Sequence, residues 1–263
     1  MPFVESNGAR THYQFDGPAA APVLVFSNSL GTNLAMWEPQ IPALSPRFRI
    51  LRYDTRGHGQ STVSPGPYNI TQLGRDVLGL LDALEVERAD FCGLSMGGVI
   101  GMWLGIYGAR RIHRLVLCNT GAKIGTPEIW NPRIEAVRKG GMAGIVEAVV
   151  ERWYSPAFIA AAPDKIEHTR RMILVTNPEG YAANCAAIRD MDLRETIARI
   201  TLPTLVIAGA KDPATPPADG RFIADRIPGA RFVELDAAHL SNIEATARFN
   251  ETLLQFLNEP EAT

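Results

Sequence analysis

The chain has 263 residues, of which 46% are apolar and 21% are charged, a length and composition ordinary for one globular α/β domain. A formal net charge of −2 provides no basic surface for nucleic acid or for an anionic membrane. Because the N-terminus lacks the features of a signal peptide and three widely spaced cysteines form no disulfide framework or metal motif, we expect a cytoplasmic protein with reduced, buried thiols.

Predicted strands and helices alternate along most of the chain. The dipeptide Asn7–Gly8 indicates a hairpin between strands at 3–6 and 10–15. Short apolar runs, typical of strands buried on both faces of a parallel sheet, follow at 23–27, 48–53, 89–94, 114–119, 204–209 and 231–236. Segments with helical periodicity lie at 69–84, 96–109, 217–227 and 241–257. This alternation predicts an α/β fold with a mostly parallel, doubly wound sheet.

Residues 121–194 interrupt this alternation, because they contain no convincing strand and are too long for a plain loop. Their amphipathic runs, at 133–153, 156–174 and 179–190, predict helices. The strand and helix pattern resumes cleanly afterwards. We therefore expect one domain over residues 1–263, with a helical cap inserted above the carboxyl edge of the sheet, where open α/β sheets bind ligands.

The stretch Gly93-Leu94-Ser95-Met96-Gly97 follows a predicted strand and opens a predicted helix. The pattern G-x-S-x-G in that context is typical of a nucleophile elbow, a tight turn that exposes the serine hydroxyl at the edge of the sheet. Small residues are needed two positions away on either side, since side chains there would clash across the turn. Ser95 is therefore the predicted nucleophile, placed at a helix N-terminus that favours developing negative charge.

A serine nucleophile needs a base, and the base needs an orienting acid. Of five histidines, His239 alone follows the last predicted strand, in the loop that should face Ser95. Asp212 directly follows the strand at 204–209 and is the predicted acid, in the chain order Ser, Asp, His that this arrangement uses. Weaker candidates for the acid are Asp236, Asp190 and Asp192. The remaining histidines are expected to be structural: His12, His58, His113 and His168.

An oxyanion hole requires two N–H groups aimed at the developing alkoxide. Met96, the residue after the nucleophile, should supply one, and Leu30, in the loop after the strand at 23–27, should supply the other. Gly31 would let that loop approach Ser95. The stretch at 53–61 also ends a strand, but its aspartate, arginine and glycines favour a network that locks a loop over a chemical role.

With these residues in place, the sequence resembles the α/β-hydrolase superfamily over essentially its whole length. The motifs GLSMGG, DTRGHGQS, GAKDPATPP and AAHLSNIE occur in the superfamily's order. The stretch FSNSLGTNLAMWEPQ, with Asn28-Ser29 where many relatives carry His-Gly, is more similar to the 3-oxoadipate enol-lactonases of aromatic-acid catabolism. That resemblance implies a cytoplasmic, cofactor-free serine esterase that opens an anionic enol-lactone.

The implied substrate carries a carboxylate, so its pocket should contain a cation. Arg133 is nominated for that carboxylate, because an arginine fork matches its two oxygens, and Trp130 is nominated as an apolar wall. Met36 and Trp37 could also reach the pocket, although packing is their expected role.

Three alternatives stay open at this point. The same triad would serve a perhydrolase or haloperoxidase-type esterase, and it would serve a hydrolase of carbon–carbon bonds. A slow-turnover receptor for small lactones is a third. The sequence leaves the oligomeric state open.

Overall fold

The computed structural model describes residues 2–259 and contains one eight-stranded sheet, in the order β1-β2-β4-β3-β5-β6-β7-β8. The first two strands pair antiparallel at one edge, and the other six run parallel. The bounds are β1 Phe3–Ser6, β2 Ala9–Asp16, β3 Val23–Ser27, β4 Arg49–Tyr53, β5 Ala89–Leu94, β6 Ile112–Cys118, β7 Thr204–Gly209 and β8 Arg231–Leu235. All eight predicted strands form, and the α/β prediction is confirmed.

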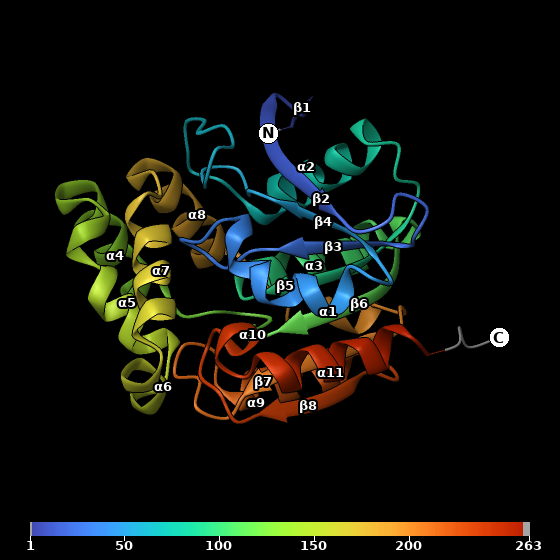
Figure 1. Ribbon diagram of the computed structural model, residues 1–263. Coiled ribbons are helices and arrows are strands. Elements are labelled where there is room, and N and C mark those ends of the chain that lie inside the picture. The colour runs from blue at the N-terminus through green and yellow to red at the C-terminus, as the bar shows by residue number, and fades with distance from the viewer. Residues whose placement is uncertain (1, 260–263) are drawn as a thin grey trace.

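Helices before β6 and after β7 surround the sheet (Figure 1). The central helix α3 (Met96–Tyr107) packs on β5 and β6, α2 (Ile70–Ala83) packs on α3, and α9 (Pro217–Arg226) packs on β7 and β8. The others are α1 Ile41–Leu44, α10 Ser241–Glu244 and α11 Thr246–Leu257, with the 3₁₀ helices η1 Leu34–Gln40 and η2 Ala109–Arg111. A further 3₁₀ helix, η4 Ile197–Arg199, lies just before β7. The helix predicted at 241–257 is thus two helices, because Ala245 leaves the helical region at φ −112° and ψ 41°.

Five helices between β6 and β7 extend to one side of the sheet, at the left of Figure 1. They are α4 Pro127–Gly140, α5 Val146–Trp153, α6 Pro156–Ala161, α7 Pro163–Leu174 and α8 Pro178–Asp190, with η3 Met142–Gly144 after α4. We call these five helices and the loops that join them the cap. The helical run predicted at 133–153 is divided between α4 and α5, since Gly141 turns the chain at φ +68°. The prediction over 156–174 also joined two helices, which separate at Pro163, a residue without an N–H.

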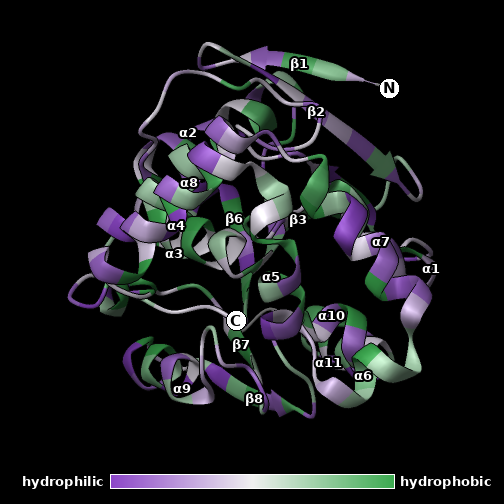
Figure 2. Ribbon diagram, turned by 90° about the vertical axis from the view of Figure 1, so that its left-hand side faces the viewer, coloured by the Kyte–Doolittle hydropathy of each residue, from purple (hydrophilic) through white to green (hydrophobic). Residues whose placement is uncertain are grey.

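The core lies between the sheet and these helices. Every residue of β5 and β7 is buried, and α3 is buried on nearly all sides, which explains why its sequence is apolar all round. Figure 2 shows the central strands mostly in the hydrophobic colour. Cys92, Cys118 and Cys185 are buried free thiols, as expected. Within residues 2–259, no helix is long and apolar enough to cross a membrane.

Candidate active site

Ser95 lies at the sharp turn between β5 and α3, with φ +57° and ψ −113°. A Cβ on Gly93 would lie 2.1 Å from the carbonyl oxygen of Gly97, so the turn tolerates no side chain there. A Cβ on Gly97 would lie 2.2 Å from the carbonyl oxygen of Ser27, so this glycine is required by the neighbouring strand β3 and not by Gly93. The N–H of Ser95 donates to the carbonyl of Cys118 at 2.9 Å, which ties the elbow to β6.

The structure brings Asp212 and His239 together, with 2.8 Å between Asp212 Oδ2 and His239 Nδ1. The buried carboxylate also accepts hydrogen bonds from Asn119 Nδ2 at 3.0 Å, Thr215 Oγ1 at 2.8 Å and the N–H groups of Ala214 and Thr215. Burial alone would raise the pKa of Asp212, but the charge of His239 and these hydrogen bonds together lower it. Asp212 is therefore held as an anion that orients the imidazole.

The loop that carries His239 is fixed from both the core and the cap. The ring of Trp153, at the end of α5, stacks on the imidazole with centroids 6.2 Å apart, and its carbonyl accepts the N–H of Leu240 at 3.1 Å. Glu244 accepts the N–H of Ala238 at 3.0 Å and a hydrogen bond from the hydroxyl of Ser155 in the cap. His239 thus depends on cap residues for its position.

The alternative acids lie elsewhere. Asp236 is exposed and pairs with Lys211 at 2.7 Å. Asp190 and Asp192 pair with the neighbouring arginines Arg189 and Arg194 on the surface. None of the three contacts His239 among the described residues.

The loop proposed for the oxyanion hole lies between β3 and η1. The carbonyl of Asn28 accepts the N–H of Gly97 at 3.0 Å, which joins this loop to the start of α3 beside Met96. The side chain of Asn28 donates to the carbonyl of Tyr53 at 2.7 Å and accepts from the indole of Trp37 at 3.0 Å. Asn28 therefore braces the loop at the position where the sequence departs from the common His-Gly.

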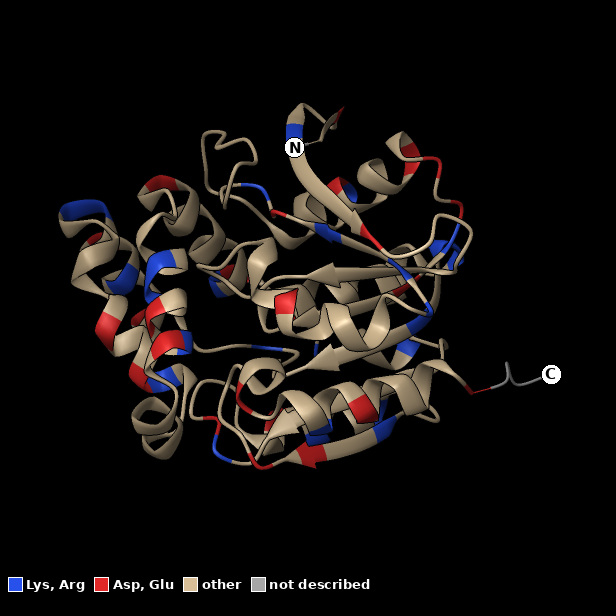
Figure 3. Ribbon diagram, in the orientation of Figure 1, with Lys and Arg blue, Asp and Glu red and all other residues tan. Residues whose placement is uncertain are grey.

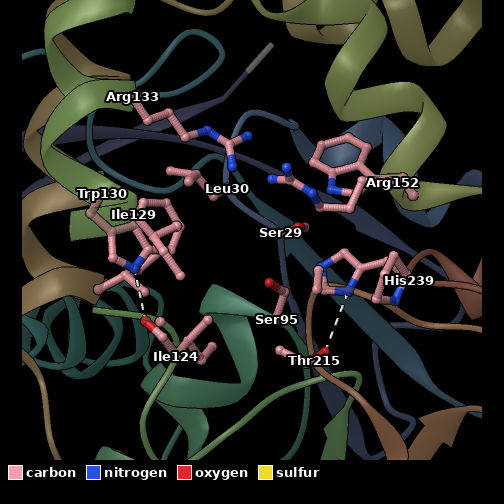
Figure 4. Close-up of a pocket in the computed structure, with 15 residues that line it drawn as sticks. Ser29, Leu30, Ser95, Ile124, Ile129, Trp130, Arg133, Arg152, Thr215 and His239 are labelled. Atoms are coloured by element: carbon pink, nitrogen blue, oxygen red, sulfur yellow. Dashed lines mark hydrogen bonds between the residues drawn. The ribbon is translucent and has the colours of Figure 1, made fainter. Parts of the chain in front are cut away.

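Leu30 and Ser95 line one pocket of about 370 Å³ together with His239 (Figure 4). Its other lining residues are Ser29, Ile124, Gly125, Ile129, Trp130, Arg133, Arg152, Trp153, Ile188, Pro213, Ala214 and Thr215. The walls are mostly apolar, as in typical small-molecule sites. Met96 is fully buried behind the elbow, and Met36 and Trp37 are buried in the core and do not line this pocket.

Two arginines from the cap extend toward each other across the pocket, above Ser95 (Figure 4). Arg133, from α4, has its guanidinium 5.5 Å from the ring centre of Trp130 and 5.6 Å from that of Tyr181. Arg152, from α5, was not predicted. Partial removal of Arg152 from solvent, and then the charge of Arg133, lower its pKa. Within residues 2–259, neither arginine forms a salt bridge, so both positive charges remain available to an anion.

Elsewhere on the cap, acidic and basic residues are interspersed (Figure 3). The two arginines therefore supply a local positive site and not part of a general positive field. Trp130 is buried, and its indole N–H donates to the carbonyl of Ile124 at 2.7 Å, which leaves its ring as an apolar wall. No group of three or more potential metal ligands is assembled in the described part of the chain.

Residues 22–158 match the sequence model of the family described as the alpha/beta hydrolase fold. The chain belongs to the α/β-hydrolase family. It is 43% identical to 3-oxoadipate enol-lactonase 2 of Acinetobacter baylyi over 92% of this chain and 91% of that protein. It is 44% identical to 3-oxoadipate enol-lactonase 1 of the same organism, over 95% and 94%. The crystal structure of the enol-lactonase from Burkholderia xenovorans superposes with a TM-score of 0.97, at 50% identity over 98% and 100%. The predicted resemblance is confirmed.

In this α/β-hydrolase, most of the site residues that sequence reasoning missed act across long chain separations. Asn119 donates to Asp212, Trp153 stacks on His239, and Arg152 faces the pocket. Thr215, which also donates to Asp212, lies only three residues after it. Only Asn119 could have been found from the sequence. It directly follows a strand, and the carboxyl end of that strand lies at the same sheet edge as Ser95.

His58 is buried, and its depressed pKa predicts an effect on stability that depends on pH. Burial lowers its pKa to about 4, although the carbonyl of Arg56 and the charge of Asp54 act in the opposite direction and raise it. The unfolded chain therefore takes up a proton below pH about 6.5 that the folded chain refuses, so stability is lost as the pH falls toward about 4. The loss due to His58 reaches about 3 kcal/mol.

We expect urea unfolding at pH 7 and at pH 4.5 to show this loss in the wild type and not in His58→Gln. Other titrating groups act equally in both proteins, so the difference between them isolates His58. An identical pH dependence in the two proteins would contradict the depressed pKa.

Proposed function

We propose that this α/β-hydrolase is a serine carboxylic-ester hydrolase that opens 3-oxoadipate enol-lactone to 3-oxoadipate. The single observation that carries the substrate class is that Arg133 and Arg152, which form no salt bridge within residues 2–259, lie above Ser95 in a small apolar pocket. The identity to two proteins named 3-oxoadipate enol-lactonase, and to a solved structure named enol-lactonase, supports the same assignment. We place this activity in cytoplasmic catabolism of aromatic compounds, within one domain whose inserted cap closes the pocket.

In the acylation step, His239 takes the proton of the Ser95 hydroxyl as its oxygen attacks the lactone carbonyl. The alkoxide of the tetrahedral intermediate is held by the N–H groups of Met96 and Leu30. Asp212, which accepts the Nδ1–H of His239, stabilises the imidazolium that forms. When the intermediate collapses, the ring C–O bond breaks and the oxygen leaves as an enolate that stays tethered to the acyl chain. The proton on the His239 imidazolium passes to this enolate, which then ketonises, and His239 is left neutral.

In the deacylation step, neutral His239 removes a proton from water, and the hydroxide attacks the acyl carbonyl. The same two N–H groups hold the second alkoxide. Collapse breaks the bond to the Ser95 oxygen, which recovers its proton from His239, and the dicarboxylate product leaves. No cofactor enters either step.

Throughout both steps, Arg133 and Arg152 hold the substrate's carboxylate at the cap side of the pocket. Planar guanidinium groups match the two carboxylate oxygens, and the surrounding apolar walls weaken competition from water. Trp130 and Ile129 contact the lactone ring on one side. Because the arginines bind a group that does not react, they should contribute to binding more than to the chemical step.

Substitution of either arginine by methionine, which keeps most of the stem, should raise KM for the anionic lactone by about 10- to 100-fold, the cost of losing a charged hydrogen bond. The kcat/KM for p-nitrophenyl acetate, a neutral ester, should change by less than about 2-fold, since it makes no such contact. Arg138→Met is the matched control, because Arg138 lies on α4 but pairs on the surface with Glu179. Equal losses on both substrates would mean that the arginines do not bind the carboxylate.

A further inference from the structure

The peptide that carries the N–H of Leu30 is fixed from its carbonyl side. The carbonyl of Ser29 accepts two hydrogen bonds from Thr32, one from its N–H at 3.2 Å and one from its hydroxyl at 2.8 Å. In a planar trans peptide, the N–H of the next residue points opposite to that carbonyl. Thr32 therefore sets the direction of the Leu30 N–H, provided that the turn keeps its shape at Gly31.

Gly31 is held on three sides. Its N–H donates to Nε2 of His58 at 2.8 Å. Its carbonyl shares the hydroxyl proton of Thr176, in the loop between α7 and α8, with the carbonyl of Met172, at 3.2 Å and 3.0 Å. Its φ is +82°, and a Cβ there would lie 3.0 Å from the ring of Tyr181. The turn is thus clamped between a histidine of the core and residues of the cap.

The hydrogen bond from Gly31 requires that Nε2 of His58 carry no proton. The ring is 1% exposed, and its burial favours the neutral form, with a pKa of about 4. The cap also supports the loop that carries His58, since Asn184 Nδ2, from α8, donates to the carbonyls of Arg56 and Gly180 at 2.8 Å each. His58 is therefore neutral near pH 7, and its Nε2 remains an acceptor there.

We propose that His58 is a positioning residue for the hydrolysis: its Nε2 holds Gly31 so that the Leu30 N–H points at the alkoxide. This inference rests on the proposed function, because it needs an oxyanion at Leu30. Thr176 completes the clamp from the opposite side, so the cap and the oxyanion loop act as one rigid unit. The sequence predicted only a structural role for His58, and this proposal adds a role in positioning the oxyanion hole.

The pair His58→Asn and His58→Gln tests this role. Both are amides, but only glutamine can place an oxygen near the position of Nε2, within reach of the Gly31 N–H. We expect His58→Asn to lower kcat by about 10- to 100-fold with KM nearly unchanged, because the oxyanion contact forms fully only in the transition state. His58→Gln should recover kcat to within about 5-fold of wild type. His168→Gln, an exposed position on α7, is the control.

A phenylboronic acid, whose adduct with Ser95 mimics the tetrahedral intermediate, supplies a second readout. Its inhibition constant should rise in His58→Asn by about the same factor as kcat falls, and it should recover in His58→Gln. Thr176→Val should give a smaller change in the same direction, and it keeps the test available if His58→Asn fails to fold. Wild-type kcat in His58→Asn, or equal losses in Asn and Gln that follow melting temperature, would overturn the inference.

Two variants, Ser95→Ala and His58→Asn, show whether the positioning role or the proposed function is wrong. If Ser95→Ala is inactive while His58→Asn keeps wild-type kcat and inhibition, only the positioning role is wrong. If Ser95→Ala retains turnover, the serine mechanism itself is wrong, and with it the oxyanion that His58 would serve.

Discussion

Ser95→Ala should lower kcat for the enol-lactone by roughly 10⁵- to 10⁶-fold, the largest effect expected of any single substitution. The hydroxyl forms the covalent bond to the acyl group, and alanine has nothing to replace it. A water activated by His239 would leave only slow turnover. Purified variant and wild type should be compared in steady state, with enough variant to detect turnover at this level.

The fold of Ser95→Ala should be preserved, so its melting temperature and circular dichroism serve as controls. The backbone at this position is held by the N–H bond to Cys118 and by the hydroxyl of Thr120, which donates to the Ser95 carbonyl at 2.8 Å. Both contacts survive the substitution, since they involve backbone atoms of Ser95. Turnover within about 100-fold of wild type in a folded variant would rule out Ser95 as the nucleophile.

Asp212→Asn should lower kcat by about 10⁴-fold, the second largest expected effect. The carboxylate accepts hydrogen bonds from five donors, including Nδ1 of His239. An amide in its place offers one oxygen and turns an NH₂ group toward the remaining donors. The imidazole then adopts the wrong tautomer, with Nε2 protonated and unable to accept the proton of Ser95.

Asp212→Asn should also lower the free energy of unfolding by about 1–3 kcal/mol, because buried donors lose the carboxylate oxygen that accepted their hydrogen bonds. Urea unfolding measures this loss. Asp219→Asn is the matched control, because this half-buried carboxyl lies nearby on α9 and makes no contact with His239. Its kcat should stay within about 2-fold of wild type. Equal activity in the two variants would exclude Asp212 as the orienting acid.

Features set by short stretches of chain were predictable from the sequence. The elbow at Ser95 depends on glycines two positions away, and the strands depend on short apolar runs, so both appear in local patterns. Asp212 and His239 were predictable for a related reason. In a parallel sheet, residues that follow successive strands meet at one edge, so chain order alone selects them.

Features that depend on tertiary packing were not predictable. Arg152 lies on α5, which follows a turn at Gly141, and the amphipathic pattern of 133–153 does not show how the chain turns there. The contact between His58 and Gly31 joins two loops through packing that neither loop indicates by itself. A single sequence carries no record of such pairings, which is why the cap was predicted in outline only.

The most direct test of the account is the kcat/KM of the wild-type enzyme for 3-oxoadipate enol-lactone beside that for p-nitrophenyl acetate, in the same buffer. Two arginines that bind the carboxylate predict a preference for the anionic lactone of at least about 100-fold. Equal or better turnover of the neutral ester would contradict the enol-lactonase assignment and leave a general serine esterase.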